Sequence, residues 1–355
     1  MNRRGVGYDV GTVFSGFPCR ICTRPRFDAA IVHRELEIIK NDLGCNAVRI
    51  TGRDPGRLIT AAQDALRQGL EVWLAPALFE KEPDETLTYY VAVATAAEPL
   101  RRQFGDRLVL GVGGELSLFM RGIAPGRTVV ERLAHLRREA IAGSNQPAER
   151  LNEFLGRASE AVRAVFRGPL TYASLIGEWV DWGRFDFVGV DHYRDARIKD
   201  RYIELLAPLL RERKPVVVTE VGMRAYRGAE DSGTLGFGVV DERSRGLSAL
   251  PLVGRFVRAR LNGAYVRDEE LQARELTEVL AILDAAGVDG AFVSSFADPI
   301  SPYSDDPRYD LDMSALSLVK TYAGGRGTTY PDMPWEPKAA FRAVAKCYAG
   351  GLAGA

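Results

Sequence analysis

The feature that most constrains this chain is an alternation of short apolar runs with longer helical stretches, repeated eight times in 355 residues. The apolar runs lie at residues 5–10, 45–50, 70–78, 107–116, 169–175, 185–193, 214–222 and 287–296. Several runs are continuously apolar rather than alternating, which is typical of parallel strands covered on both faces. Between the runs, apolar residues recur at helical spacing, as from Asp28 to Leu43, where Gly44 then ends the helix.

Eight strand–helix units predict a (β/α)8 TIM barrel, whose active site lies at the C-terminal ends of the strands. The alternative, an open doubly wound sheet, would carry a Gly-rich phosphate loop after its first strand. The segment VGYDVGT at 6–12 lacks the required G-x-G-x-x-G spacing. The long segments 223–264 and 297–335 follow strands seven and eight, where insertions build binding clefts. We expect one barrel domain spanning residues 1–355.

Composition narrows the function classes. The 47 Lys and Arg residues balance 47 Asp and Glu residues, so neither a nucleic acid nor an anionic membrane is an expected partner. No signal peptide or transmembrane run is recognisable, which predicts a cytoplasmic protein.

Three histidines are too few for a typical metallohydrolase rim, so we expect neither a metal nor a cofactor. Cys19 and Cys22 form an isolated C-x-x-C pair and are interpreted as loop cysteines without a catalytic role.

Charged and polar residues stand at the ends of four predicted strands. They are Arg49 after strand two, Glu115 after strand four, His192 with Tyr193 after strand six, and Glu220 after strand seven. Any one of them could belong to a buried ion pair at the top of the barrel. Four strand ends that converge on one rim favour a functional site instead.

Glu115 and Glu220 end strands that lie nearly opposite each other in an eight-stranded barrel. Two carboxylates facing each other across a cavity are the arrangement that glycoside hydrolysis requires, with a separation of ~5–5.5 Å in retaining enzymes. Arg49 would favour the ionised form of Glu220. Glu115 follows two glycines and has no basic residue within four positions, so we expect a raised pKa suited to a general acid.

These residues resemble those of the clan A glycoside hydrolases. The segments GGEL at 113–116, DFVGVDHY at 186–193 and TEVG at 219–222, together with Arg49, are most similar to the β-mannanase-like barrels of glycoside hydrolase family 113. The segment TTYPDMPWEPKAAFRA at 328–343 is also similar to uncharacterised bacterial barrels, some of which are labelled abortive phage infection proteins.

The resemblance implies a retaining enzyme in which Glu220 is the nucleophile and Glu115 the acid/base residue. It also implies that Arg49, His192 and Tyr193 bind the substrate. That substrate would be a β-linked hexoside oligomer or polysaccharide, with a mannoside as the first choice. A transglycosidase would share the same catalytic residues, and a catalytically silent barrel that binds a glycan or another partner would share the fold.

Two positions depart from the clan pattern. Gly114 stands where an Asn that binds the sugar 2-hydroxyl is usual. Phe296 replaces the usual Trp after strand eight, so we expect its ring to stack beneath the sugar, as the floor of the sugar site. Trp179 and Trp182 follow the fifth strand, and either stack against sugar rings or pack a helix on the barrel. Asp298, with its acidic neighbours in the final loop, is interpreted as part of a solvated acidic segment.

Overall fold

The computed structural model describes residues 1–15, 20–233, 238–250 and 252–350. Eight parallel strands close a barrel in which β1 pairs with both β4 and β10. The barrel strands are β1 Arg3–Asp9, β4 Ala47–Gly52, β5 Glu71–Pro76, β6 Leu108–Gly114, β7 Leu170–Leu175, β8 Val188–Asp191, β9 Val216–Val221 and β10 Gly290–Val293. Each coincides with one of the eight predicted runs, so the predicted (β/α)8 barrel is confirmed. Cys19 lies outside the described residues.

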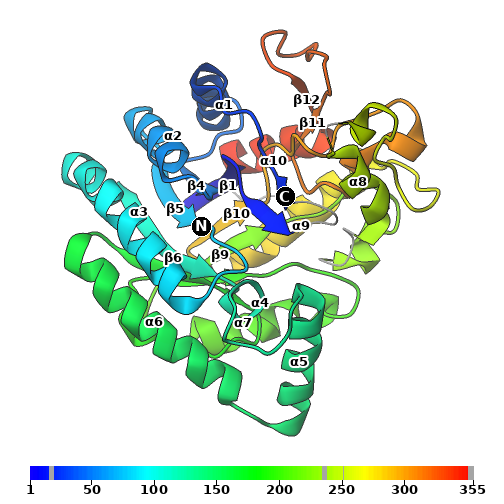
Figure 1. Cartoon of the computed structure of the whole chain (residues 1–355). Coiled ribbons are helices and arrows are strands. Elements are labelled where there is room, and N and C mark those ends of the chain that lie inside the picture. The colour runs from blue at the N-terminus through cyan, green and yellow to red at the C-terminus, as the bar shows by residue number, and fades with distance from the viewer. Residues whose placement is uncertain (16–19, 234–237, 251, 351–355) are drawn as a thin grey trace.

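Helices surround the barrel, and Figure 1 shows α1, α2, α3 and α6 outside the strands. The helices are α1 Ala29–Asn41, α2 Pro55–Arg67, α3 Pro83–Phe104, α4 Leu116–Phe119, α5 Val129–Ala142, α6 Gln146–Val165, α7 Tyr202–Leu210, α8 Glu242–Ser248, α9 Glu269–Ala285 and α10 Ala339–Gly350. The sequence specifies several of their starts: the Asp28 side chain caps α1, and Asp54 caps α2 ahead of Pro55. The apolar faces of these helices then cover the outer surface of the strands.

Large side chains fill the interior of the barrel toward the N-terminal ends of its strands. Trp73 and Phe292 lie there with their ring centroids 5.3 Å apart. Gly5 has to lack a side chain, because a Cβ at this position would lie 2.3 Å from the Phe292 ring. This end of the barrel is therefore closed by apolar packing, and the open, polar end is the one at which β6, β8 and β9 terminate.

The two long segments predicted after strands seven and eight carry α8 and two short antiparallel strands, β11 Val319–Thr321 and β12 Trp335–Pro337. The segments are joined to each other: the Leu261 amide donates to the Arg308 carbonyl at 2.9 Å. Arg267, three residues after the first segment, also pairs with Asp310 at 2.9 Å and with Asp312 at 2.8 Å in the second. These contacts fix both insertions on the same side of the barrel, where they line one of the cavities described below.

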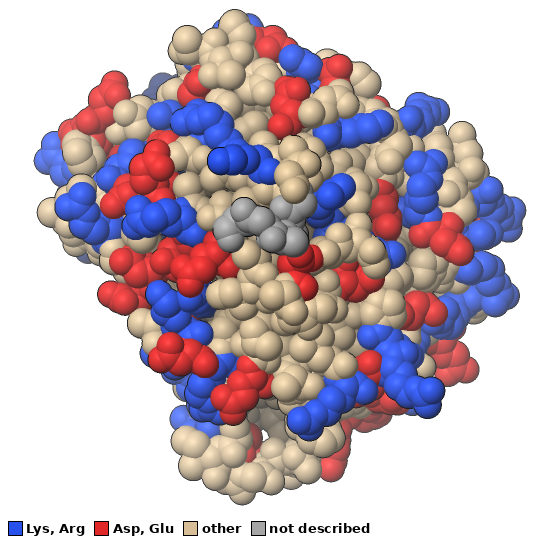
Figure 2. Space-filling view, turned by 180° about the vertical axis from the view of Figure 1, so that it is seen from behind, with Lys and Arg blue, Asp and Glu red and all other residues tan. Residues whose placement is uncertain are grey.

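The surface carries charges of both signs. On the face shown in Figure 2, Lys and Arg side chains are interspersed with Asp and Glu side chains. This mixture agrees with a formal net charge of zero. Within the described ranges, no helix is long and apolar enough to cross a membrane.

Candidate active site

Glu220 is held by two neighbours at the C-terminal end of the barrel. Arg49 of β4 donates from Nη1 to Glu220 Oε1 at 2.7 Å. Tyr193, which follows β8, donates its hydroxyl to Glu220 Oε2 at 2.7 Å. Both carboxylate oxygens are thus fixed, and the adjacent guanidinium stabilises their negative charge. The contact between Arg49 and Glu220 that the sequence predicts is present.

Glu115 lies at the point where β6 ends and α4 begins. Its backbone is left-handed, with φ of 45°, and the glycine two residues earlier, Gly113, has φ of 92°. The two residues turn the chain sharply at the strand end, and the Glu115 amide donates to the Ala173 carbonyl at 2.8 Å. A non-glycine residue in this conformation is strained, and such strain concentrates at functional sites.

The pKa of Glu115 is raised well above its usual range. Burial is the largest cause, followed by the negative charges of Asp191 and Glu220, while Arg49 opposes the shift. The direction is the one expected from the sequence. The sequence argument included only the apolar setting of Glu115. In the structure, the charges of neighbouring carboxylates raise its pKa as well.

Asp191, the last residue of β8, is a third carboxyl group in this site and was missed as a candidate. It is buried, and it accepts a hydrogen bond from the Thr219 hydroxyl at 2.6 Å. Burial, and then the charge of Glu220, raise its pKa to about 8, against the opposing effect of Arg49. The available signal was its place at the end of an apolar run, directly before His192.

Two adjoining cavities open beside these residues. The Glu115 cavity, of about 280 Å³, is lined by Glu115, Asp191 and Glu220. The Arg224 cavity, of about 310 Å³, is lined by Glu220, Tyr193 and Arg224 but not by Glu115. Arg49 and Glu220 border both. The site is therefore a cleft with Glu220 in the middle and Glu115 toward one end.

A buried hydrogen-bond network supports the turn that presents Glu115. The Tyr172 hydroxyl accepts from the Leu116 amide at 2.8 Å and donates to Glu178 Oε2 at 2.9 Å. Glu178 also accepts from the amides of Ser117 at 3.1 Å and Leu175 at 2.9 Å. These bonds tie the start of α4 to the end of β7, and so hold the Glu115 backbone against its strain.

His192 does not line either cavity. It is buried, its ring stacks on that of Tyr202 with centroids 3.9 Å apart, and Nε2 lies 2.8 Å from the Tyr202 carbonyl oxygen. Burial lowers the pKa of His192 to about 4, so the ring is neutral near pH 7. The expectation that His192 binds the substrate is therefore corrected, because this side chain packs the loop after β8 against α7.

The expected aromatic platforms also lie elsewhere. Trp182 is buried, with its ring centroid 5.9 Å from that of Phe185. Trp179 is 79% exposed and borders a groove beside α5 and α6 rather than the Glu220 cleft. Both therefore stand apart from the candidate site, because the turn after β7 directs them toward the helices.

Asp298, expected in a solvated loop, instead lines the Arg224 cavity.

Phe296 belongs to the core and not to the sugar site. It is fully buried, and its ring packs against Tyr8, Trp335 and Phe341 with centroid distances of 6.3, 5.2 and 6.5 Å. The side chain faces α10, so the predicted sugar floor is wrong for this residue. Ser294 and Ser295 line the Arg224 cavity at the corresponding strand end.

This placement reverses the expected effect of Phe296→Ala. Removing a fully buried phenyl ring leaves a cavity, which typically lowers the free energy of unfolding by about 3–5 kcal/mol. Affinity for a bound sugar should change little in the fraction that remains folded. Chemical denaturation measures the first effect and titration with a ligand the second. A stable variant with weakened sugar binding would contradict the core assignment.

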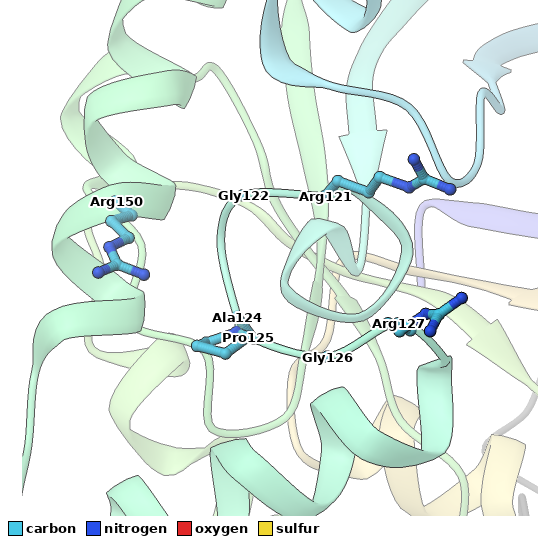
Figure 3. Close-up of a pocket in the computed structure, with 7 residues that line it drawn as sticks. All are labelled: Arg121, Gly122, Ala124, Pro125, Gly126, Arg127 and Arg150. Carbon is cyan, nitrogen blue, oxygen red and sulfur yellow. The ribbon is translucent and has the colours of Figure 1, made fainter.

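A further hollow, of about 510 Å³, lies between the segment after α4 and helix α6. It is bordered by Arg121, Arg127 and Arg150, yet Figure 3 shows Arg121 and Arg127 extending to one side, away from Arg150. The guanidinium groups do not converge on one point, so we assign no ligand to this hollow.

In the part of the chain that the structure describes, no group of three or more His, Cys, Asp or Glu side chains is placed to hold a metal ion.

Comparisons with known proteins bear on the fold. No protein-family model and no curated protein matches the chain. Among solved structures, a GH113 β-1,4-mannanase aligns with a TM-score of 0.58 at 13% identity, over 98% of both chains. The GH113 β-mannanase AaManA from Alicyclobacillus acidocaldarius aligns with a TM-score of 0.55 at 15% identity, over 98% of this chain and 97% of the other.

The similarity extends beyond the mannanases. A glycoside hydrolase family 5 enzyme from Prevotella bryantii B14 aligns with a TM-score of 0.53 at 12% identity, over 98% of this chain and 96% of the other. The chain thus shares the (β/α)8-barrel fold of these glycoside hydrolases. The resemblance found in three short segments and Arg49 is thereby confirmed at the level of the fold, over nearly the whole chain.

Proposed function

We propose that this protein is a retaining β-glycoside hydrolase, with Glu220 as the nucleophile and Glu115 as the acid/base residue. The observation that carries the proposal is the opposite environment of two carboxyl groups on one cavity. Glu220 is paired with Arg49 and hydrogen-bonded by Tyr193. Glu115 forms no ion pair with any described residue, and burial raises its pKa. One group is thus prepared to attack as an anion and the other to donate a proton.

In the first step, a Glu220 oxygen attacks the anomeric carbon while the bond from that carbon to the leaving oxygen breaks. The proton on Glu115 passes to the leaving oxygen, which departs as a neutral alcohol. The ester bond neutralises the charge of Glu220, which removes one of the causes that raise the pKa of Glu115. Glu115 can then take a proton from water, whose oxygen attacks the anomeric carbon and releases Glu220.

Asp191 fits this scheme as a group that tunes its neighbours. Its negative charge is the largest electrostatic contribution to the raised pKa of Glu115, after burial itself. Thr219 holds the Asp191 carboxyl in place through a hydrogen bond of 2.6 Å. Because the pKa of Asp191 is itself raised to about 8, this charge is present mainly above that pH, where it helps to keep Glu115 protonated. Asp191 has no covalent role of its own.

The proposed substrate is a β-linked hexoside oligomer or polysaccharide, and a β-mannoside is the first to test. The segments GGEL and TEVG support this choice through their resemblance to family 113. Two adjoining cavities on either side of Glu220 are consistent with a substrate of at least two units, one on each side of the cleaved bond. No cofactor takes part in the proposed reaction.

A panel of aryl β-glycosides and β-linked oligosaccharides tests the proposal. We expect hydrolysis of at least one member, with the β-anomer of the product appearing first in a proton NMR time course, because two displacements retain the configuration. An added acceptor sugar separates hydrolysis from transglycosylation by its products. Binding without cleavage of any member would favour a catalytically silent glycan-binding barrel, and first release of the α-anomer would exclude a retaining mechanism.

A further inference from the structure

The Arg224 cavity has a chemical character that a neutral sugar does not require. In the proposed reaction, the leaving group must lie beside Glu115, because Glu115 protonates it. Glu115 borders only the Glu115 cavity, whereas Glu220 borders both. The sugar that is transferred to Glu220 therefore occupies the Arg224 cavity, and the residues that line this cavity select that sugar.

Arg224 lies in this cavity without an acidic partner. Its side chain is buried, with Nε donating to the Ser314 carbonyl at 2.8 Å and Nη1 to the Gly233 carbonyl at 2.6 Å. Among the described residues, no carboxylate lies within ion-pair distance of it, and Nη2 forms no hydrogen bond. Burial lowers the pKa of Arg224, against the opposing effects of Tyr193, Tyr226 and Asp298. The two carbonyl groups fix the orientation of the guanidinium and leave one of its nitrogen atoms for a ligand.

Arg245 reaches the same cavity from α8, in the other part of the first insertion. Its Nε is buried and has no hydrogen-bond partner in the described ranges. Its nearest acidic contact is Glu242, at 3.6 Å from Nη1, on a side chain that is itself 57% exposed. A buried donor without a partner is costly, and a bound acceptor would remove that cost.

The acidic groups around the cavity do not cancel these two charges. Glu220 is already paired with Arg49. Asp9 accepts from the Gly11 amide and the Thr23 hydroxyl, both at 2.6 Å, at the border with the Glu115 cavity. Asp298 accepts from Ser301; burial raises its pKa and the charge of Arg245 opposes that shift. Asp298 is thus one carboxyl group beside two guanidinium groups. The part of the cavity around Arg224 and Arg245 therefore carries an excess of positive charge.

We propose that the Arg224 cavity binds a sugar that carries an anionic group, held by Arg224 and Arg245. This inference rests on the proposed function, whose substrate class it narrows from a hexoside to an acidic hexoside. The planar guanidinium donates paired hydrogen bonds to carboxylate and sulfate oxygens, so uronic acids and sulfated hexoses share the required chemistry. A neutral hexose would leave the Arg224 guanidinium without an anionic partner and would not neutralise the charge beside the buried Nε of Arg245.

Kinetics on matched substrates test the inference. Aryl β-glucuronide and β-mannuronide are compared with the aryl β-glucoside and β-mannoside, and a 6-sulfated hexoside distinguishes sulfate from carboxylate recognition. We expect an acidic member to have the highest kcat/KM. Arg245→Gln should lower that value about 10- to 100-fold, the usual effect of losing a hydrogen bond to a charged group, and should affect neutral substrates less.

The matched control is Arg243→Gln, which makes the same change in charge on an exposed residue of the same helix, outside both cavities. It should leave kcat/KM for the acidic substrate unchanged. Arg224→Lys keeps the positive charge at a buried position where Arg224→Gln could unfold the protein, and it should reduce selectivity for the acidic substrate. A preference for neutral sugars that Arg245→Gln does not alter would overturn the inference.

A binding measurement separates this inference from the proposed reaction. Ligand-observed NMR with methyl β-glucuronide, methyl β-mannuronide and their neutral counterparts requires no turnover. If the acidic sugar binds to the wild type and not to Arg245→Gln, but no substrate is cleaved, the anionic site stands and the hydrolase proposal fails. If neutral glycosides are cleaved and no acidic sugar binds, the anionic site is wrong and the hydrolase proposal stands.

Discussion

Replacing Glu220 by alanine should abolish turnover of every substrate. The proposed nucleophile forms the bond to the anomeric carbon, and no other described carboxylate is placed by both an arginine and a tyrosine in this cleft. Loss of a covalent nucleophile typically lowers kcat by about 10⁵-fold or more. The loss should not depend on the leaving group, since the variant lacks the first bond-forming step. Initial rates on an activated aryl glycoside and on a natural oligosaccharide measure this.

Controls are needed because Glu220→Ala also leaves the buried guanidinium of Arg49 without its partner. Glu220→Gln keeps the size of the side chain and one acceptor oxygen, and it should be as inactive as Glu220→Ala while unfolding closer to the wild type. Glu71→Gln removes a comparable pair at the other end of the barrel, where Glu71 contacts Arg3 at 2.6 Å. That variant should remain active. Substantial activity in Glu220→Gln would show that Glu220 is not the nucleophile.

The fold was predictable from this sequence because parallel strands buried on both faces leave continuous apolar runs. The run at 214–222 contains β9, and the run at 107–116 contains β6. Polar residues that follow such runs must reach the C-terminal rim of the barrel, since the strands are parallel. The same argument placed Arg49, Glu115 and Glu220 on one cleft, as the structure confirms.

The aromatic residues were less predictable, because position in the chain does not say which way a loop side chain points. Phe296 occupies the expected strand end, yet it faces α10 rather than the cleft. Trp179 and Trp182 follow one strand, yet one is exposed and the other buried. His192 sits one residue after a cavity carboxylate and points to the opposite side, toward α7.

Residues contributed by the insertions could not be found from the sequence at all. Arg224 and Arg245 lie 21 positions apart in the chain, in a segment without periodic pattern, and share a cavity only because the insertion folds back over the barrel. Asp298 comes from the second insertion, and contacts such as Leu261 with Arg308 bring the two together. The strand ends thus specified the reacting groups, whereas the groups that select the sugar depend on tertiary contacts.

Glu115→Ala should affect substrates according to their leaving groups. A general acid is needed when the leaving oxygen is strongly basic, and its loss typically costs about 10²- to 10⁴-fold. A dinitrophenyl leaving group departs without a proton, so the first step with this substrate should proceed at nearly the wild-type rate. Hydrolysis of the covalent intermediate should then be slow, because water lacks its base. Pre-steady-state measurement should show a rapid burst followed by slow turnover.

The pH dependence should change in the same variant. Because burial and neighbouring carboxylates raise the pKa of Glu115, the wild type should keep its protonated acid up to unusually high pH and lose kcat/KM as the pH rises through that value. Glu115→Ala should lose this decline with the activated substrate. Asp191→Asn removes one of the charges that raise the pKa, so it should move the decline to lower pH without abolishing turnover. If kcat/KM still declines at the same pH in Glu115→Ala, the decline belongs to another group, and Asp191 is the first alternative.

Added azide completes the test, because it attacks without needing a base. It should accelerate the Glu115→Ala variant and convert a β-glycoside into a β-glycosyl azide, since Glu220 still forms the intermediate on the opposite face of the sugar. Glu220→Ala treated in the same way should yield no β-glycosyl azide, because it forms no intermediate. An α-glycosyl azide from Glu115→Ala would mean that the two carboxylates have the reverse roles, with Glu115 on the side of the nucleophile and Glu220 protonating the leaving group. The contacts of Glu220 with Arg49 and Tyr193 argue for the β-product, since they hold its carboxylate in place, whereas the raised pKa belongs to Glu115.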